Sequence, residues 1–487
     1  MLFNSWNFIV YFLPIVVAGF YLQPSGWLVS RKLWLIGASF YFYAYWRLEY
    51  VPLLVGSILF NYAVAESIIR ATRLARAVLT FGVAGNLLLL SYFKYTNFAV
   101  HFLGQVVRRD LGHFNILLPL AISFFTFTQI SYLVDVFRDR KAHYRFLDYS
   151  LFVVLFPHLI AGPIVRHWEI IPQFENRPIP ARAENFSVGL ALFILGLVKK
   201  MYADGASPYA DKVYHAAGAG LAFTTFDAWL GTIAFAVQIY FDFSSYSDMA
   251  IGLARIFGIR FPANFDSPYR AASVIGFWER WHRTLTRFLR EYVYFSLGGN
   301  RRGPGRQVVN IMITMLLSGL WHGAGWTYIV WGGLHGLFLV INHQWRLLRQ
   351  RMSWTATNFF YHAGAAGLTF VAVTFAWVFF RAPSVHVAMT VVERMAGRHA
   401  HHLHSAVGIS RYGDAVGTVL GLLLVCWLFP NTQQLLRRYD PILEEVRPAR
   451  FSLKLDWPLG LLLGVLLYLV LRNCYVTEPS PFIYFNF

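Results

Sequence analysis

Two histidines in the stretch SGLWHGAGWTYIVWGGLHG (318–336), His322 and His335, lie inside a long apolar run. An ionisable side chain at membrane depth is costly, and such residues commonly mark a functional site. Gly323 and Gly325 follow His322, so we expect the helix to loosen there and to let a substrate approach the imidazole ring. Because the pKa of histidine lies near neutrality, His322 is suited to act as a general base.

Four neighbours of His322 bear on that role. Trp321 and Trp326 are expected to shield the ring from lipid as aromatic walls of the site. Ser318 lies one helical turn earlier on the same face, where it forms either a Ser–His nucleophile pair or a hydrogen bond to its own helix backbone. His335 lies about 20 Å further along a continuous helix. It reaches the same substrate only if the chain turns back at the glycines.

Another histidine, His282, lies within the arginine-rich segment GFWERWHRTLTRFLREYVYFSLGGNRRG (276–303). Four arginines recur at helical spacing on one face, namely Arg280, Arg283, Arg287 and Arg290. Five large apolar residues fall on the other face, namely Trp278, Trp281, Leu285, Phe288 and Tyr292. This pattern predicts an amphipathic helix at the membrane interface, whose arginines contact either lipid phosphates or an anionic substrate. His282 lies at the edge of the aromatic face, and we expect it to point into the protein.

Other polar residues are candidates for binding. The segment GGNRRGPGR (298–306) predicts a turn in which freed backbone amides and Arg301 contact phosphate groups. Asp242 and Asp248 are unusual in an apolar setting. Each carboxylate either orients a histidine or an arginine, or forms a structural ion pair or helix cap.

Metal binding is a rival interpretation for the histidines. The cluster HAHHLH (399–404) is dense enough to hold a metal, but no carboxylate or cysteine lies close to it, and we interpret it as a solvated loop. The two cysteines, Cys426 and Cys474, exclude a disulfide scaffold and a multi-cysteine metal site. His158 is another histidine in an apolar context, for which a packing role is the simplest reading. We therefore predict no metal site.

The composition shows which elements must position these residues. Hydrophobic residues make up 57% of the 487 residues and charged residues 14%, with a mean hydropathy of +0.48. Because soluble domains carry about 25% charged residues, this chain belongs in a membrane. The net charge of +18 is explained first by basic cytoplasmic loops beside anionic lipid headgroups. No soluble basic module for nucleic-acid binding is visible.

Apolar stretches recur through the whole chain and predict an all-α, polytopic membrane protein with a single domain, residues 1–487. They lie near 7–22, 33–46, 50–64, 77–93, 115–136, 149–165, 186–203, 226–243, 307–321, 325–342, 359–380, 415–429 and 457–471. Glycine and proline break the stretches 156–165 and 318–325, so we expect about 11–13 spanning and re-entrant helices in total.

Charge in the connecting loops predicts an orientation. Basic residues gather in 23–32, 66–76 and 137–146, which places these loops in the cytoplasm and the N-terminus outside. The first apolar run lacks the basic region and small-residue cleavage site of a signal peptide, so we expect it to be a permanent span.

Five long motifs occur in a fixed order within 118–342. They are LPLAISFFTFTQISYLVDVFR (118–138), FPHLIAGPIVR (156–166), IYFDFSSYSDMAIGLARIFGIRFPANFDSPY (239–269), FWERWHRTLTRFLREYVYFSLGGNRRG (277–303) and LSGLWHGAGWTYIVWGGLHG (317–336). FAWVFFRAPS (375–384) and FIYFNF (482–487) follow them. Together these motifs resemble the membrane-bound O-acyltransferase family, and within it the bacterial alginate and exopolysaccharide O-acetyltransferases.

This resemblance implies a bundle of spanning and re-entrant helices around a central tunnel, in which the arginine-rich part, 260–306, is interfacial or re-entrant. It implies that His322 of the WHG motif is catalytic and that His282 of the RWH motif lines the reaction site. Expected substrate-binding residues are Trp281, Arg280, Arg283, Arg301, Trp321 and Asp242. The donor would be acetyl-CoA from the cytoplasm, with no permanently bound cofactor.

The same resemblance implies a setting and leaves alternatives. The protein would lie in the bacterial inner membrane, among membrane lipid, beside periplasmic acetyltransferase partners and polysaccharide-export machinery. Transfer of D-alanyl groups from a carrier protein to a cell-wall polymer uses similar motifs and stays open. A transporter without chemistry is a third possibility, although no internal repeat is visible. Alginate, cellulose and peptidoglycan all remain open as the polymer.

Overall fold

The computed structural model describes residues 1–24, 26–71, 73–140, 143–175, 182–353, 358–398, 405–477 and 479–483. All regular elements in these ranges are helices, which confirms the predicted all-α class. Backbone contacts divide the chain into two compact units, described separately here. The first comprises Met1–Val198, Ser245–Ala263 and Thr432–Asn486, and the second Lys199–Ser244 and Asn264–Asn431.

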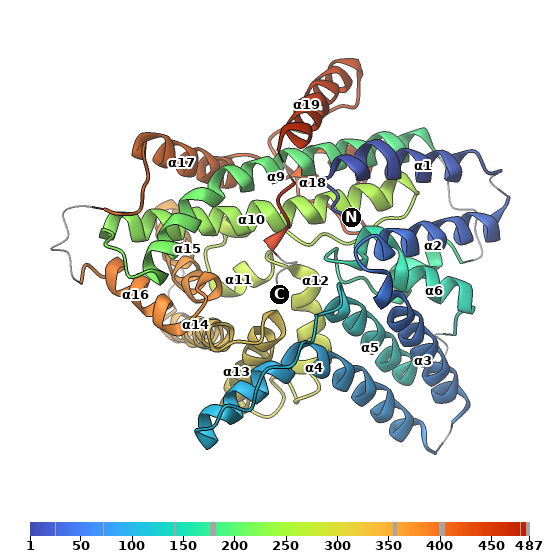
Figure 1. Cartoon of the computed structure of the whole chain (residues 1–487), viewed down its shortest axis with the longest axis horizontal. Helices are drawn as coiled ribbons and strands as arrows, with labels where there is room; N and C mark the ends of the chain where they lie inside the picture. The colour runs from blue at the N-terminus through green and yellow to red at the C-terminus, as the bar shows by residue number, and fades with distance from the viewer. Residues whose placement is uncertain are drawn as a thin grey trace. The chain divides into compact units, whose positions relative to one another are not determined.

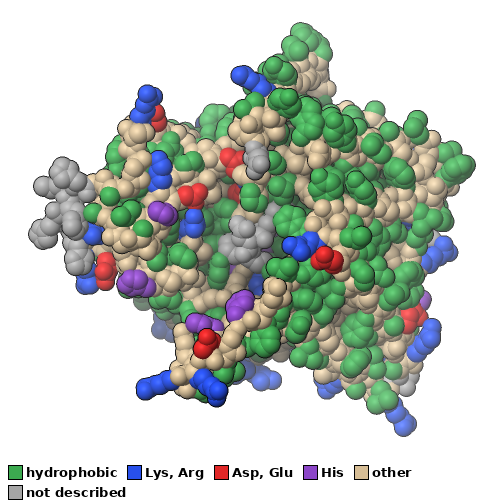
Figure 2. Space-filling model, viewed as in Figure 1, with side chains coloured by type: hydrophobic (Ala, Val, Ile, Leu, Met, Phe, Trp, Pro, Cys, Tyr) green, Lys and Arg blue, Asp and Glu red, His purple; other side chains and the backbone are tan. Residues whose placement is uncertain are grey.

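Several helices are suited to cross a membrane, which confirms a multi-pass membrane protein. Within the described ranges, five are long and apolar enough: Leu48–Arg70, Ala75–Val107, Ala183–Gly218, Phe359–Arg381 and Trp457–Val476. Two shorter apolar helices, Asn7–Tyr21 and Tyr412–Leu428, add to them. Hydrophobic side chains cover much of the face seen in Figure 2, as expected of helices that meet lipid instead of water.

The first unit contains the N-terminal helices and the C-terminal helix (Figure 1). Its elements are η1 (Asn7–Phe12), α1 (Leu13–Tyr21), α2 (Leu28–Ala44), η2 (Leu48–Tyr50), α3 (Val51–Arg70), α4 (Ala75–Val107), α5 (Ile122–Arg138), α6 (Phe146–Val154), α7 (Phe156–Leu159), α8 (His167–Ile170), η3 (Ile171–Gln173), α18 (Thr432–Leu435), η6 (Arg437–Tyr439) and α19 (Trp457–Val476). It also holds the start of α9 (Ala183–Gly218) and the end of α10 (Thr225–Ile256).

The predicted break in 156–165 is present in this unit. The short α7 follows directly on α6, and the chain then continues without regular structure through buried residues. His158 lies in α7 and its Nε2 is 2.8 Å from the Phe152 carbonyl oxygen, so its ring is held by the backbone. In the same unit Gln433 donates to Asp248 Oδ1, which gives Asp248 a structural partner.

The second unit carries the motif residues. Besides the rest of α9 and α10, it contains η4 (Pro268–Arg270), α11 (Val274–Trp278), α12 (Arg283–Phe288), η5 (Leu289–Tyr294), α13 (Pro304–His322), α14 (Trp326–Arg351), α15 (Phe359–Arg381), α16 (Val385–Met395) and α17 (Tyr412–Leu428).

Two glycines explain why α13 and α14 form a tight antiparallel hairpin. A Cβ atom on Gly319 would lie 2.2 Å from the Tyr328 carbonyl oxygen, and one on Gly332 would lie 2.3 Å from the Met315 carbonyl oxygen. The two backbones therefore touch at positions where only hydrogen atoms fit between them. The chain turns back between His322 and Trp326, which meets the condition under which His322 and His335 can share a site.

The predicted continuous amphipathic helix over 276–303 is wrong. The chain forms the short helices α11 and α12 with a break at Glu279–His282, and then the π-helical η5. His282 has a left-handed backbone (φ 41°), which an L residue rarely adopts and which no helix can pass through. The expected turn after it is present, with Gly298, Gly299 and Gly303 all at positive φ.

Candidate active site

The indole of Trp331, in α14, lies between two histidines. Its ring centroid is 5.0 Å from that of His322, with the planes nearly perpendicular, and 4.9 Å from that of His335. All three side chains are buried. The hairpin thus brings together two imidazoles that a straight helix would have separated by about 20 Å.

A second indole connects His322 with His282. The ring centroid of Trp321 is 4.9 Å from that of His322 and 6.4 Å from that of His282. Trp321 is buried, as expected of a residue that shields the site from lipid. We call the five side chains His282, Trp321, His322, Trp331 and His335 the histidine–tryptophan cluster.

His282 is fixed by its own unusual backbone and by Asn264. The Asn264 carbonyl oxygen accepts from the Arg283 amide at 2.9 Å, and its side-chain Oδ1 lies 3.0 Å from His282 Nδ1. Thr284 Oγ1 donates to the same Oδ1 at 2.9 Å. Since Oδ1 can only accept, His282 carries its proton on Nδ1 and presents Nε2 as an acceptor.

The charge state of His282 follows from its surroundings. Its side chain is fully buried, and the Phe243 ring packs edge-on against it with centroids 4.7 Å apart. His282 lies between α11 and α12, outside the helices suited to span the membrane. Burial lowers its pKa to about 3, because the imidazolium would lose its hydration. His282 is therefore a neutral ring at physiological pH.

Two expectations about the surroundings of His322 are wrong. Trp326 does not shield the ring, since its side chain is 48% exposed at the start of α14. The space over Gly323 is not open to a substrate, because a Cβ there would lie 2.1 Å from the Tyr328 ring. The walls of the site are instead Trp331 and Phe380, whose ring centroid lies 5.3 Å from that of His322.

Ser318 is fully buried, and its hydroxyl has no hydrogen-bond partner among the described residues. The structure therefore contains neither a Ser318–His322 hydrogen bond nor the expected bond to the helix backbone within these residues.

Two of the predicted binding residues lie in the interior. Trp281 is buried and stacks on Phe277 with ring centroids 5.5 Å apart, at the centre of an aromatic core. Asp242 accepts from Lys200 at 2.7 Å, and Lys200 also pairs with Asp204 at 2.9 Å. Of the two alternatives for Asp242, the structure supports the structural ion pair, which joins α9 to α10.

The predicted phosphate-binding arginines lie near the surface. Arg280 and Arg283 are half-buried around the break at His282, and Arg301 is exposed in the glycine turn. Asn310 anchors this turn by donating to the Gly299 carbonyl oxygen at 2.8 Å. The histidine cluster at 399–404 lies outside the described residues. Elsewhere in the chain, no three His, Cys, Asp or Glu side chains gather as a metal site among the described residues.

A cavity of about 310 Å³ approaches the histidine–tryptophan cluster from α12, η5, α13 and α14. Its lining includes the polar residues Arg290, Asn300 and Gln307 and the apolar residues Trp278 and Met315. The ring of Trp278 lies 5.1 Å from that of His335 and 5.9 Å from that of Trp331. Trp278 therefore both lines this cavity and contacts the cluster.

Sequence reasoning missed three residues of this site, namely Trp331, Asn264 and Trp278. Trp331 lies one helical turn before His335, and the assumption of a hairpin would have placed it between the histidines. Asn264 lies 18 residues before His282, and no local pattern connects the two.

Comparisons with known proteins agree with the fold and the motifs. The model of the MBOAT, membrane-bound O-acyltransferase family, matches residues 20–384. The chain is 36% identical to the peptidoglycan O-acetyltransferase of Helicobacter pylori, over all of this chain and 98% of that protein. It is 37% identical to the probable alginate O-acetylase AlgI of Pseudomonas putida, over the full length of both.

A more distant similarity is also present. The chain is 28% identical to the teichoic acid D-alanyltransferase of Streptococcus thermophilus, over 46% of this chain and 57% of that protein. The family model covers most of the chain and contains the hairpin and the break at His282. The chain is therefore an acyltransferase of the membrane-bound O-acyltransferase family.

Proposed function

We propose that the protein transfers an acetyl group from acetyl-CoA to an acceptor hydroxyl group, and that the acetyl group finally reaches an extracytoplasmic polysaccharide. The observation that carries the proposal is the buried histidine–tryptophan cluster, in which His322 ends α13 among aromatic rings. A dry aromatic surrounding favours acyl transfer over hydrolysis, because it excludes competing water. Full-length similarity to two proteins named for O-acetylation supports the acetyl group.

In the proposed step His322 acts as general base. The acceptor hydroxyl oxygen attacks the thioester carbonyl carbon while His322 takes the hydroxyl proton. The new C–O bond forms, the C–S bond breaks, and the proton passes from His322 to the departing thiolate of coenzyme A. Atoms and charge balance, and the imidazole returns to its neutral state.

A histidine that lines the reaction site can hold or polarise the thioester, or orient the acceptor, and the hydrogen bond of His282 decides between these roles. Because its Nδ1–H is directed at Asn264, its Nε2 can accept a hydrogen bond but cannot donate one to a thioester carbonyl. Its low pKa keeps it from acting as an acid near neutral pH. We therefore propose that His282 accepts a hydrogen bond from a group of the acceptor other than the reacting hydroxyl, whose single proton passes to His322, and that His282 does not polarise the donor.

The donor would enter through the 310 Å³ cavity. Its mixture of polar and apolar lining suits a pantetheine arm, and Arg290 lines it directly. Arg301 lies in the neighbouring turn, and Arg280 and Arg283 flank the break at His282. These arginines would contact the phosphates of coenzyme A. Rotation of Trp278 would open the cavity to the cluster.

The proposed cellular setting rests on the family for the membrane and the partners, and on the basic loops for the orientation. The protein would lie in the inner membrane with its N-terminus in the periplasm. There, partner proteins would receive the acetyl group and pass it to the polymer, beside the polysaccharide-export machinery.

The test uses purified protein in nanodiscs with acetyl-CoA and a hydroxyl-bearing oligosaccharide as acceptor, and measures release of the coenzyme A thiol in wild type, His322→Gln and His386→Gln. His386 is an exposed histidine at the start of α16 and serves as the matched control. We expect release in wild type and His386→Gln, and loss in His322→Gln. Thiol release that persists in a folded His322→Gln variant would refute the role of His322.

D-alanyl transfer is the second candidate, favoured by the similarity to teichoic acid D-alanyltransferase. The same assay with D-alanyl carrier protein as the donor separates the two. Turnover of that donor alone, with acetyl-CoA inert, would replace acetyl transfer by D-alanyl transfer.

A further inference from the structure

A groove of about 720 Å³ lies between α14 and α15, together with the start of α11. From α14 it is lined by one helical stripe, namely Phe338, Ile341, Asn342, Trp345, Arg346 and Arg349. From α15 it is lined by a second stripe, namely Tyr361, His362, Ala365, Leu368, Thr369 and Ala372. Since single members or adjacent pairs recur every three or four residues, each stripe occupies one face of its helix.

The groove has a polar end and an apolar end. Arg349 donates to the Tyr361 hydroxyl at 3.0 Å, and its guanidinium lies 4.9 Å from the centre of that ring, so these two residues fix one end. Because the helices are antiparallel, the start of α15 meets the end of α14 there. Phe338 and Ala372 lie at the other end, about three helical turns away along each stripe.

The polar end is basic and aromatic. Arg346 is exposed beside Arg349, and Trp345 and Tyr361 are the residue types that gather at the headgroup level of membranes. Among the residues that the structure describes, no Asp or Glu side chain lines the groove. This end therefore favours an anionic group that both arginines can reach.

The apolar end suits hydrocarbon. Ile341 is 55% exposed and Leu368 is 73% exposed, so both side chains face outward from the protein. Because Leu368 lies on a helix that is suited to span a membrane, its surroundings are expected to be lipid. From Phe338 to Arg349 the groove extends about 16 Å along α14. That length matches the depth of one leaflet, about half of a 30 Å hydrocarbon core.

We propose that this groove binds a phospholipid with an anionic headgroup, whose phosphate contacts Arg346 and Arg349 and whose acyl chains lie along Ile341 and Leu368. Alanines at 365 and 372 leave the space that the chains occupy. The proposal is independent of the acyl-transfer reaction.

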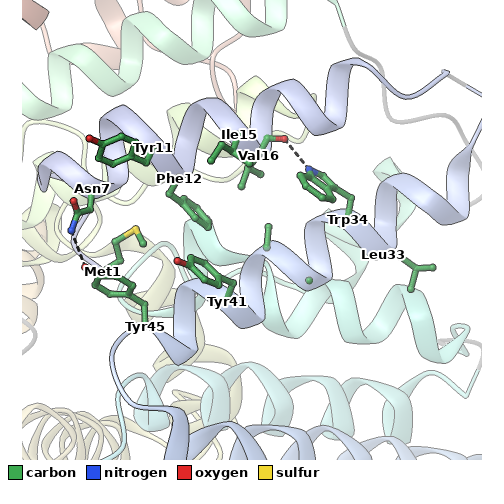
Figure 3. A pocket seen from close by; sticks show the side chains of 12 residues that line it. Met1, Asn7, Tyr11, Phe12, Ile15, Val16, Leu33, Trp34, Tyr41 and Tyr45 are labelled. Atoms are coloured by element: carbon green, nitrogen blue, oxygen red, sulfur yellow. Dashed lines mark hydrogen bonds between the residues drawn. The ribbon is translucent and has the colours of Figure 1, made fainter.

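A second groove shows by contrast why the arginines matter. It lies between α1 and α2 with a volume of about 570 Å³, and is lined by rings and aliphatic side chains such as Phe12, Ile15 and Tyr41 (Figure 3). Among the described residues, no Lys, Arg, Asp or Glu side chain lines it, and its polar groups are few, among them Asn7, the N-terminal Met1 and tyrosine hydroxyls. We therefore expect it to show no preference for an anionic headgroup.

The test is native mass spectrometry of the full-length protein released from detergent with phosphatidylglycerol or phosphatidylcholine. We expect wild type to retain phosphatidylglycerol in preference. Arg346→Gln should weaken that retention about tenfold, as expected for a lost hydrogen bond between charged groups. Arg351→Gln, an exposed arginine of the same helix outside the groove, should leave it unchanged.

A second pair of variants tests whether the groove binds the acyl chains of the lipid. Ala372→Leu fills the groove and should lower retention of both lipids, whereas Ala363→Leu, an exposed alanine of the same helix outside the groove, should not. Equal retention of the two lipids by wild type, or full retention by Ala372→Leu, would overturn the proposal. A dimer that Ala372→Leu abolishes would assign the groove to a second copy of the chain and would also overturn it.

Discussion

Gly332→Ala is the substitution whose effect the hairpin geometry determines most sharply. The new methyl group would lie 2.3 Å from the Met315 carbonyl oxygen, about 1 Å inside the 3.4 Å at which ordinary contact begins. Because that atom belongs to the backbone, α13 and α14 must move apart. His322 and Trp331 are carried on these two helices, so their contact must change as well.

We expect Gly332→Ala to lower both the stability of the protein and its turnover. Overpacking of this kind costs about 1–3 kcal/mol, partly offset by the higher helix propensity of alanine, about 1 kcal/mol. A displacement of about 1 Å at a reacting group lowers turnover on the order of 100-fold. We therefore expect a modest fall in melting temperature and a large fall in thioester turnover.

Gly333→Ala is the matched control in the next position. Its methyl group would lie 3.7 Å from Leu316 Cδ2, which is ordinary contact, so stability should stay the same or rise slightly. Both variants are measured by thermal unfolding in detergent and by coenzyme A thiol release in nanodiscs. If Gly332→Ala is as stable and as active as Gly333→Ala, the argument from the hairpin is refuted.

Three further predictions concern buried groups. The pKa of His282 is lowered from 6.5 to about 3 on folding, so between these pH values the unfolded state binds one proton more than the folded state, and stability rises with pH. In His282→Asn the melting temperature should therefore rise less steeply from pH 4 to 6.5. An unchanged slope would contradict the neutral ring assigned to His282. Lys200→Met removes the partner of the buried Asp242 carboxylate, which costs about 3–5 kcal/mol of stability. This single variant should lower the melting temperature more than the double variant Lys200→Met/Asp242→Leu. A double variant that is less stable than the single one would argue against the ion pair. Trp331→Phe should reduce turnover strongly, because the Trp331 indole contacts both His322 and His335. Trp326→Phe, at an exposed position, should leave turnover unchanged. Equal turnover in the two variants would show that Trp331 is not part of the site.

Local patterns predicted most of the helices. Apolar runs predicted α13 and α15 within a few residues at both ends, because a spanning helix needs a long apolar run. They predicted the starts of α3, α9 and α14 equally well, but these helices continue beyond the predicted ends at 64, 203 and 342. The interruptions within 156–165 and 318–325 were also predicted, because Gly162 and Pro163 in the first, and Gly323 and Gly325 in the second, favour the end of a helix.

The arginine-rich segment shows where a local pattern fails. The spacing of its arginines predicts a helix that continues through His282. Instead, the Arg283 amide donates a hydrogen bond to the distant Asn264 carbonyl oxygen, and the chain makes a left-handed turn at His282. Tertiary contact overrides helical periodicity there. A residue that contributes such a bond from 19 positions away carries no signal in the local sequence.

The site was predicted in part for a related reason. His322 could be named from the sequence because it lies in a long apolar run, where an ionisable side chain is costly, and His282 because it lies at the edge of an aromatic face. Tryptophans are common in this chain, 16 in all, so the sequence could not distinguish the buried Trp331 from the exposed Trp326. That distinction depends on which face each helix turns inward within the hairpin.

The most direct test of the role of His322 is a comparison of donor binding and acetyl transfer in wild type and His322→Ala, with radiolabelled acetyl-CoA and protein in nanodiscs. The proposed mechanism predicts that His322→Ala binds acetyl-CoA with nearly unchanged affinity but transfers no acetyl group above background. Transfer by His322→Ala at the wild-type rate would contradict it, because the hydroxyl proton would then have another acceptor.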